Sequence, residues 1–304
     1  MRMISEAVTE AIKNYVSADQ IHLQEPMADH TTFRIGGPAD CLVELENEEQ
    51  LKSIQKYLTL VEERFFILGN GSNLLVSDHG YRGVILQVGR RMSGIRTEGN
   101  CIVAQAGATL AQTARAALES GLSGLEFASG IPGTVGGGVV MNAGAYDGEL
   151  SQVVKQVRAV SREGEVLEFD NAGMEFGYRT SVLRKNFFTV TETVFELKEG
   201  DREQIRAKME ELAKRRRQKQ PLEFPSAGST FKRPAGYFAG KLIMDAGMRG
   251  YQVGGARVSD RHCGFIINVG KASAQDVLDV ICEVKERVRL RFGVDLETEV
   301  IYLE

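Results

Sequence analysis

The chain has 304 residues, with 37 lysines and arginines against 41 aspartates and glutamates, for a formal net charge of −4. This balance excludes a global attraction to nucleic acid or to an anionic membrane, and the length predicts two or three domains. No apolar run approaches a membrane span, so membrane insertion is not expected. The four cysteines are far apart and form no C-x-x-C pair, which indicates reduced thiols in a cytoplasmic protein.

Short strands alternate with helices through the first two thirds of the chain. Residues 1–16 have apolar side chains at helical spacing with acids between them, which predicts an amphipathic helix and not a signal peptide. The following elements are predicted, in chain order: strand Cys41–Leu45, helix Glu48–Leu58, strands Phe65–Leu68, Val84–Val88 and Ile102–Gln105, helix Thr109–Ser120, and strands Val153–Val160, Glu165–Phe169 and Phe188–Leu197.

The last third begins after a charged helix, Asp201–Lys219, which two prolines end. That stop predicts a domain boundary. A helix at Ser273–Phe292 opens with a capping box and closes at Gly293, and Asp295–Leu303 is expected to be a final strand. The irregular order of strands and helices favours an α+β fold over a doubly wound sheet.

The segment Ser129–Gly144 reads SGIPGTVGGGVVMNAG and is the densest glycine cluster in the chain. Ordering so many glycines costs backbone entropy, so a ligand cradle with bare N–H groups is one interpretation. A mobile linker is the alternative, but the interleaved apolar residues argue against it. A second turn, LGNGSNLLVSD, follows strand Phe65–Leu68 and suits a pyrophosphate, although a plain β-turn fits equally well.

Other segments carry weaker signals. Arg34 lies beside two glycines, and Tyr178–Ser181 sets an arginine beside a phenol, which suits a carboxylate but is also typical of a surface loop. Ser229 lies in a turn that lacks the G-x-S-x-G nucleophile elbow, so a hydrolase nucleophile is not expected there. Glu297 and Glu299 share a strand face, where acids are usually solvated. The basic helix end at 215–219 lacks interleaved aromatics and is interpreted as a solvated face, with the alternative that one or two of its cations face a phosphorylated substrate. The histidines form no metal pattern.

Taken together, these segments resemble the UDP-N-acetylenolpyruvoylglucosamine reductase (MurB) family of peptidoglycan synthesis. The matching pieces are DHTTFRIGGPAD, LGNGSNLLVSD, SGIPGTVGGGVVMNAGAYDGEL, GYRTS, SAGSTFKRP with AGKLIMDAG, GGARVSDRHCGFIIN and LETEV. They run in the family's order from residue 29 to residue 300, and only their combination is specific. The short spacing from Arg179 to Ser229 resembles the compact form of the family, which lacks the substrate-loop insert.

The resemblance implies an FAD-binding region of the vanillyl-alcohol-oxidase (PCMH) type at 1–219, with subdomains at about 1–88 and 89–219, and an α+β substrate-binding domain at 220–304. It implies a cytoplasmic oxidoreductase that holds FAD non-covalently and takes electrons from NADPH. Hydride passes from flavin N5 to C3 of the enolpyruvyl ether of UDP-N-acetylglucosamine, and C2 is protonated to give UDP-N-acetylmuramate. Cell-wall biogenesis, cell shape and division follow from that product. A monomer is expected, with an oligomer left open.

The resemblance also implies the site residues. Arg179 matches the catalytic arginine that stabilises the aci-carboxylate, Ser229 the proton donor to C2, and Glu299 the catalytic glutamate. The expected substrate contacts are Tyr178, Lys219, Gly228, Arg233 and Lys241. The expected cofactor contacts are Arg34, Gly69, Asn70, Gly71, Ser72, Asn73, Leu74, Gly107, Ala108, Ser129, Gly130, Ile131, Pro132, Gly133, Gly136, Gly137, Gly138, Val140, Asn142, Ala143 and Gly144. No metal is expected.

Some positions depart from the family's pattern. Thr298 replaces a usual proline and is expected to loosen the placement of Glu299, whereas Thr180 and Cys263 are expected to be neutral. Arg233 stands where longer members have asparagine, so diphosphate recognition is expected to differ. Two other readings stay open: a different FAD oxidase or dehydrogenase of this fold, for which His30 would be the nearest covalent attachment point, and a flavin-binding protein without turnover.

Overall fold

The structure is a computed structural model that describes residues 4–146 and 148–304. The described chain folds into two compact units, and neither is continuous in sequence. Unit 1 is built from residues within Met1–Leu23, Cys41–Asn70 and Gly83–Arg216, and unit 2 from Gln24–Asp40, Gly71–Arg82 and Arg217–Glu304. Each unit has its own core of buried apolar side chains. The mixture of helices and strands in both units confirms the α+β class.

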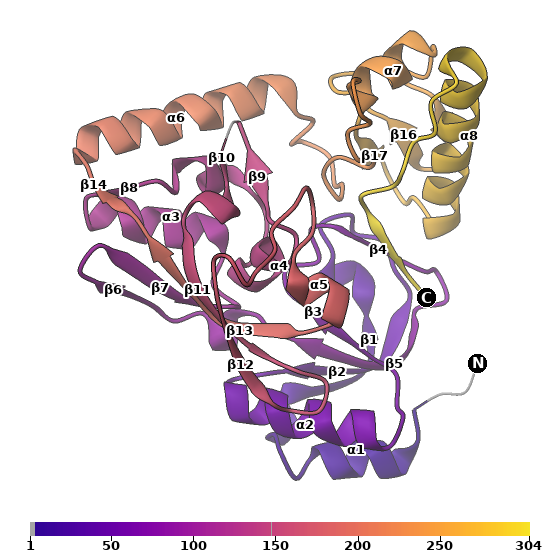
Figure 1. Cartoon of the computed structure of the whole chain (residues 1–304). Helices are drawn as coiled ribbons and strands as arrows, with labels where there is room; N and C mark the ends of the chain where they lie inside the picture. The colour runs from indigo at the N-terminus through magenta and orange to yellow at the C-terminus, as the bar shows by residue number, and fades with distance from the viewer. Residues whose placement is uncertain (1–3, 147) are drawn as a thin grey trace. The chain divides into compact units, whose positions relative to one another are not determined.

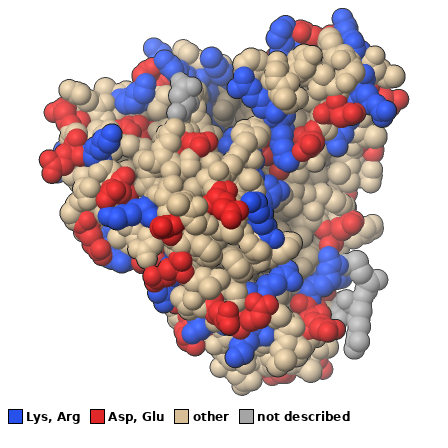
Figure 2. All heavy atoms as spheres, in the orientation of Figure 1, with Lys and Arg blue, Asp and Glu red and all other residues tan. Residues whose placement is uncertain are grey.

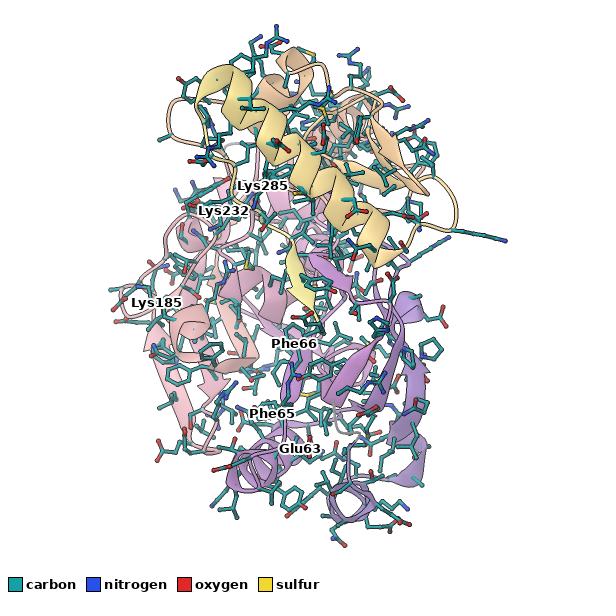
Figure 3. All side chains as sticks on the ribbon, turned by 90° about the vertical axis from the view of Figure 1, so that its right-hand side faces the viewer. Glu63, Phe65, Phe66, Lys185, Lys232 and Lys285 are labelled. Atoms are coloured by element: carbon teal, nitrogen blue, oxygen red, sulfur yellow. The ribbon has the colours of Figure 1, made fainter. Side chains whose placement is uncertain are left out.

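Unit 1 is organised around an antiparallel sheet of five strands in the order β12-β11-β13-β7-β6 (Figure 1). The sheet strands are β6 (Ile95–Glu98), β7 (Cys101–Gln105), β11 (Val154–Val160), β12 (Val166–Asp170) and β13 (Thr189–Glu196). A second sheet has the order β1-β2-β5-β3, with β1 (Ile21–Pro26), β2 (Pro38–Glu44), β3 (Phe65–Leu68) and β5 (Tyr81–Gln87). Residues 24–26, 38–40 and 81–82 of these strands belong to unit 2. Strand β3 pairs parallel with β5, and Figure 3 labels two of its residues, Phe65 and Phe66.

Helices and short ribbons complete unit 1. The helices are α1 (Glu6–Ile12), α2 (Glu48–Leu60), α3 (Leu110–Glu119), α4 (Val135–Val140), α5 (Val182–Asn186) and α6 (Arg202–Lys219), whose last residues belong to unit 2. The 3₁₀ turns are η1 (Ala18–Gln20), η3 (Arg90–Met92), η4 (Glu126–Gly130) and η5 (Leu150–Gln152). The ribbons pair β8 (Leu122–Ser123) with β14 (Lys198–Glu199) and β9 (Gly144–Ala145) with β10 (Gly148–Glu149).

Unit 2 packs two helices beside a small antiparallel sheet (Figure 1). These elements are η2 (Met27–His30), α7 (Ala239–Asp245), α8 (Ala274–Phe292), β15 (Gln252–Val253), β16 (Ala256–Val258) and β17 (Ile266–Asn268). A separate parallel pair joins β4 (Leu74–Val76) to β18 (Ile301–Leu303), two segments from opposite ends of the sequence. The carboxylate of Asp78 accepts from the backbone N–H groups of Ala274 (2.8 Å) and Gln275 (3.1 Å), so the segment after β4 also caps α8.

The predicted elements agree with the structure to within a few residues, with two exceptions. Helix α1 covers only Glu6–Ile12 of the predicted 1–16, of which residues 1–3 lie outside the described ranges. Helix α3 is capped by Thr109, and α8 is capped by Ser273 and ends at Gly293, which has φ +67°, as predicted. The final strand is shorter than the predicted Asp295–Leu303, because only Ile301–Leu303 pairs as a strand. Acidic and basic side chains are interspersed on the face shown in Figure 2.

Candidate active site

The glycine-rich segment Ser129–Gly144 contains the short helix α4 and uses most of its own N–H groups. Val135 donates to the Ala108 carbonyl (2.7 Å), and Gly136 donates to the Ala106 carbonyl (2.9 Å). Thr134 caps the helix, because its hydroxyl accepts from Gly137 N–H (3.4 Å). The expectation of bare N–H groups is therefore wrong for the start of α4, since the chain itself satisfies them.

Close packing explains most of the glycines instead. A Cβ on Gly136 would lie 3.0 Å from the Ala106 Cβ, one on Gly138 3.0 Å from Leu110 Cδ1, and one on Gly144 2.8 Å from the Gly148 carbonyl oxygen. Gly137 is different, because it is exposed and the nearest atom to its Cβ position is 3.6 Å away. Among the described residues of unit 1, no contact requires a glycine at this helical position.

Two other predicted cofactor segments lie against the glycine-rich segment within unit 1. The Asn70 side-chain amide donates to the Pro132 carbonyl (3.4 Å), and a Cβ on Gly69 would lie 2.5 Å from the Thr134 hydroxyl. The segment at Gly107 and Ala108 pairs with residues 133–136, as described above for Ala108. Unit 1 thus brings together the predicted residues of three separate loops.

The remaining predicted cofactor residues, Arg34 and the segment 71–74, belong to unit 2. Gly71 has φ +58°, and a Cβ there would lie 2.0 Å from the His30 carbonyl oxygen, so this turn requires glycine. Arg34 is exposed and also has a positive φ of +55°. The imidazole Nε2 of His30 lies 2.8 Å from a Glu25 carboxylate oxygen.

Arg179 lies at the tip of a tight turn in unit 1. Gly177 and Thr180 close the turn with two backbone hydrogen bonds of 3.1 and 3.3 Å. Arg179 itself has φ +56°, a conformation that costs a non-glycine residue about 1 kcal/mol or more. Its guanidinium lies 5.2 Å from the ring centroid of Tyr178, which is 55% exposed. Strain of this kind persists only where surrounding contacts hold it.

Three hydrogen bonds attach this turn to the end of the glycine-rich segment. The Ser181 hydroxyl donates to the Val140 carbonyl (2.9 Å), and Arg179 Nη2 donates to the Gly144 carbonyl (3.4 Å). The buried Asn142 side chain donates to the Gly177 carbonyl (3.2 Å) and accepts from the Ser151 backbone N–H (2.9 Å). The amide of Asn142 is thus used inside the protein, where it holds the arginine turn.

Arg216 is a residue that the sequence interpretation assigned to a solvated face. Its neighbours Arg215 and Arg217 are exposed, but Arg216 is half-buried against Gly130, where an added Cβ would lie 3.2 Å from the arginine Cδ. Burial lowers its pKa, and Tyr146 partly offsets that effect. Among residues 4–146 and 148–304, no carboxylate forms an ion pair with Arg216. Helical periodicity could have indicated which of the arginines faces inward.

Unit 2 brings Ser229 and Glu299 onto neighbouring extended segments. Ser229 forms an isolated antiparallel bridge with Phe265, and the next residue, Thr230, accepts a backbone hydrogen bond from Glu299 N–H (2.8 Å). Ser229 is exposed and Glu299 is half-buried. The backbone pairing therefore brings the segments of Ser229 and Glu299, which are 70 positions apart in the sequence, side by side.

The two acids at the end of the chain have different surroundings. Glu297 forms an ion pair of 2.9 Å with Lys232, and this hydrogen bond, with the charges of Lys232 and Lys285, lowers the Glu297 pKa (Figure 3). Thr298 forms an antiparallel bridge with Phe231, in which Lys232 N–H donates to the Glu297 carbonyl (2.9 Å) and Glu299 N–H donates to the Thr230 carbonyl (2.8 Å). The backbone N–H of Glu299 is thus hydrogen-bonded with threonine at position 298.

The predicted substrate residues are dispersed over both units. Besides Tyr178, they are Lys219 at the end of α6, Gly228 at φ +76°, Arg233 stacked 4.0 Å from the Phe238 ring centroid, and Lys241 in an exposed 2.8 Å ion pair with Asp245. Burial and the charge of Lys219 lower the pKa of His262, which places that lysine near His262 in unit 2. No helix in the described ranges is long and apolar enough to cross a membrane.

Two family models match different parts of the chain. Residues 220–303 match the family model for the UDP-N-acetylenolpyruvoylglucosamine reductase C-terminal domain, and residues 39–170 match an FAD binding domain. The chain is 49% identical over 286 residues to the UDP-N-acetylenolpyruvoylglucosamine reductase of Clostridium perfringens (strain SM101 / Type A), covering 94% of each chain. It is 47% identical over 297 residues to the reductase of the same name from Caldanaerobacter subterraneus, covering 98% of each.

Solved structures show the same relationship. The crystal structure of the reductase from Thermus caldophilus superposes with a TM-score of 0.80 at 36% identity and covers 93% of this chain and 98% of that one. An alkyldihydroxyacetonephosphate synthase, at 17% identity and a TM-score of 0.51, shares only the fold over 64% of this chain. On the full-length identity to its relatives, the chain belongs to the UDP-N-acetylenolpyruvoylglucosamine reductase family.

Proposed function

We propose that this protein reduces the enolpyruvyl ether of UDP-N-acetylglucosamine to UDP-N-acetylmuramate in peptidoglycan synthesis, with FAD as cofactor and NADPH as reductant. The observation that carries the proposal within the structure is Arg179, which is held at positive φ by hydrogen bonds to the glycine-rich segment. Backbone strain at a charged residue is found most often at functional sites, which supports a catalytic position for Arg179. Family membership gives the substrate class.

The residues of unit 1 fit FAD. Gly137 is exposed at a helical position where packing does not require glycine, and Arg216 offers a half-buried guanidinium that no described carboxylate neutralises. Bound flavin would supply two-electron hydride transfer, which no side chain can provide. Gly137 would allow the cofactor to approach the backbone, and Arg216 would stabilise negative charge on it.

Arg179, Ser229 and Glu299 are proposed to act on the substrate. Hydride addition to an enol ether that bears a carboxylate builds negative charge on that carboxylate, and the Arg179 guanidinium would stabilise this charge. The Ser229 hydroxyl would donate the proton to C2, and Glu299 would assist that transfer. A hydroxyl is a weak acid, so placement of Ser229 matters more than its pKa.

The remaining proposals concern context. Tyr178, Lys219, Gly228, Arg233 and Lys241 would contact the substrate or its diphosphate, and the stacked Arg233 offers a planar fork for phosphate oxygens. We place the protein in the cytoplasm, where its nucleotide substrates occur, and expect it to act as a monomer. Through its product it would contribute to cell-wall growth, cell shape and division.

The proposal is tested by the visible spectrum of the purified protein. A yellow protein should be bleached by NADPH and should regain its colour anaerobically when UDP-N-acetylglucosamine enolpyruvate is added. Arg179→Ala and Ser229→Ala should still bind flavin and be bleached, but should regain colour at least about 100-fold more slowly. Recovery of colour with oxygen but not with the ether would instead indicate an oxidase of the same fold.

A further inference from the structure

The backbone around Glu299 is held on one side by Asn73. The Asn73 side-chain amide donates to the Glu299 carbonyl (3.1 Å), and Ile301 N–H donates to the Asn73 backbone carbonyl (3.0 Å). These two bonds flank Val300, so they fix the direction in which the chain leaves Glu299. Both residues lie in unit 2, although 226 positions separate them in the sequence.

The other side of Glu299 is held by the segment that carries Ser229. Glu299 N–H donates to the Thr230 carbonyl (2.8 Å), and the buried Thr230 hydroxyl accepts from Ile266 N–H (3.1 Å). Thr230 is therefore anchored to strand β17, and Ser229 precedes it directly. The peptide groups on both sides of the Glu299 Cα are thus hydrogen-bonded, one towards Asn73 and one towards the Ser229 segment.

The Asn73 side chain reaches Glu299 just before the strand pairing begins. The register pairs Ile301 with Leu74, so Glu299 lies before the first paired residue of β18. The Asn73 amide donates to the Glu299 carbonyl at this point. The turn before it is fixed by Gly71, whose φ of +58° and contact with the His30 carbonyl exclude a Cβ.

We infer that Asn73 is a positioning residue, which holds Glu299 beside Ser229 for protonation of the substrate, and is not primarily a cofactor contact. The inference rests on the proposed function. It assigns the second half of the LGNGSNLLVSD motif to the protonation step, while Gly69 and Asn70 stay with the glycine-rich segment of unit 1. Reduction of the flavin by NADPH involves no proton transfer to C2, so only the later step should depend on Asn73.

The test compares Asn73→Ala and Asn73→Asp with the unchanged protein. Both variants remove the donor, and Asn73→Asp keeps the shape of the side chain in case the alanine variant is poorly folded. We expect each to bind FAD and to be bleached by NADPH within about two-fold of the normal rate. Anaerobic recovery of colour with the enolpyruvyl ether should be slower by about 10-fold or more.

A double-mutant cycle with Glu299→Gln tests whether Asn73 acts through Glu299. In the Glu299→Gln background, Asn73→Ala should change the recovery rate less than about two-fold, because the group it positions is gone. Asn268→Ala is the matched control, since the Asn268 amide also donates to a backbone carbonyl in unit 2, that of Phe33 (3.2 Å). It should leave the recovery rate within about two-fold of normal.

Three outcomes would overturn the inference. These are loss of FAD from the Asn73 variants, equal effects of Asn73→Ala in both backgrounds, and unchanged recovery in Asn73→Ala and Asn73→Asp. Failure of the proposed function is separate, because then the unchanged protein would not regain colour with the ether.

Discussion

At the scale of single residues, two adjacent glycines in α4 are predicted to have opposite effects when replaced. Gly137→Ala should stabilise the flavin-free protein by about 0.5–1 kcal/mol, because alanine is the better helix former and its Cβ would make only an ordinary 3.6 Å contact with the Thr134 hydroxyl. Gly136→Ala should destabilise it by about 1–3 kcal/mol, because its Cβ would lie 3.0 Å from the Ala106 Cβ. Urea unfolding of the flavin-free variants measures both.

The same two variants, Gly136→Ala and Gly137→Ala, distinguish a glycine needed for packing from one needed for FAD binding. If Gly137 is kept for close approach of FAD, Gly137→Ala should weaken FAD affinity by about 10-fold or more, equivalent to about 1.4 kcal/mol, as measured by fluorescence titration. A Gly137→Ala protein that is more stable and binds FAD normally would contradict this role. Glycines of the two kinds look alike in sequence, so the structure was needed to tell them apart.

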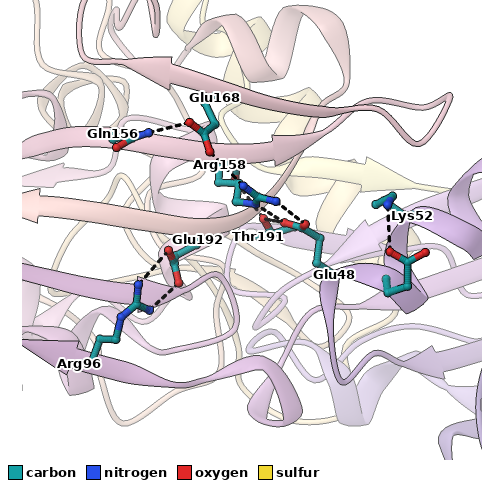
Figure 4. Close-up of polar contacts among 9 residues, drawn as sticks. Glu48, Lys52, Arg96, Gln156, Arg158, Glu168, Thr191 and Glu192 are labelled. Carbon is teal, nitrogen blue, oxygen red and sulfur yellow. Dashed lines mark hydrogen bonds and ion pairs between the residues drawn. The ribbon is translucent and has the colours of Figure 1, made fainter.

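At the scale of elements, Glu48 at the start of α2 connects that helix to the main sheet of unit 1 (Figure 4). Its carboxylate accepts from Arg158 Nε (2.8 Å) and Nη2 (2.9 Å) on β11 and from the Thr191 hydroxyl (2.7 Å) on β13. The hydrogen bond from Arg158 is the main cause of its lowered pKa, and burial opposes it. Both partners lie on the five-stranded sheet, so this single carboxylate bridges three elements.

Glu48→Gln is predicted to lower the free energy of unfolding by about 1 kcal/mol at pH 7. A folded-state pKa below the ordinary value gives stability that is present above the unfolded pKa and is lost as pH falls through the folded value. The difference in the free energy of unfolding between Glu48→Gln and the unchanged protein should therefore shrink as the pH is lowered below about 4. Urea unfolding at several pH values measures this.

Glu49→Gln is the matched control for this prediction. The neighbouring Glu49 pairs with Lys52 on its own helix (2.9 Å), and its side chain is 75% exposed. Glu49→Gln should change the free energy of unfolding by less than about 0.5 kcal/mol, both at pH 7 and below pH 4. Equal losses in both variants would show that the bridge to the sheet contributes nothing specific.

Signals local in the sequence predicted the helices and strands well, but they did not predict which distant strands pair. The strand Phe65–Leu68 and the caps Thr109, Ser273 and Gly293 were readable because apolar runs and capping residues act over a few positions. The parallel pairing of β4 with β18 was not readable, since no local rule connects Leu74 with Ile301.

The candidate site divides in the same way. The motif resemblance gave Arg179, Ser229 and Glu299 as candidates, but not the strained turn or the Asn73 contact. The inward position of Arg216 was missed because a run of basic residues was interpreted as one solvated face. In each case the missing information concerned a contact distant in sequence or a single backbone angle.

At the scale of the whole molecule, FAD is expected to raise the thermal stability of the protein. A ligand at 100 times its dissociation constant stabilises the folded state by about 2.7 kcal/mol. The midpoint of thermal unfolding should therefore rise with FAD concentration in the unchanged protein and in Asn73→Ala, and much less in Gly137→Ala. Adenosine monophosphate, which lacks the isoalloxazine ring, serves as the control and should produce a smaller shift. A midpoint that does not respond to FAD would contradict the assignment of unit 1.

The pairing of β4 with β18 has a consequence for biosynthesis. When the ribosome has made Asn73, the partner residue Glu299 is still 226 positions away. At about 5–20 residues per second, β4 waits roughly 10–45 s for its partner strand. During that time the buried face of Leu74–Val76 is exposed on the nascent chain, and it is the segment of this protein that we expect chaperones to shield.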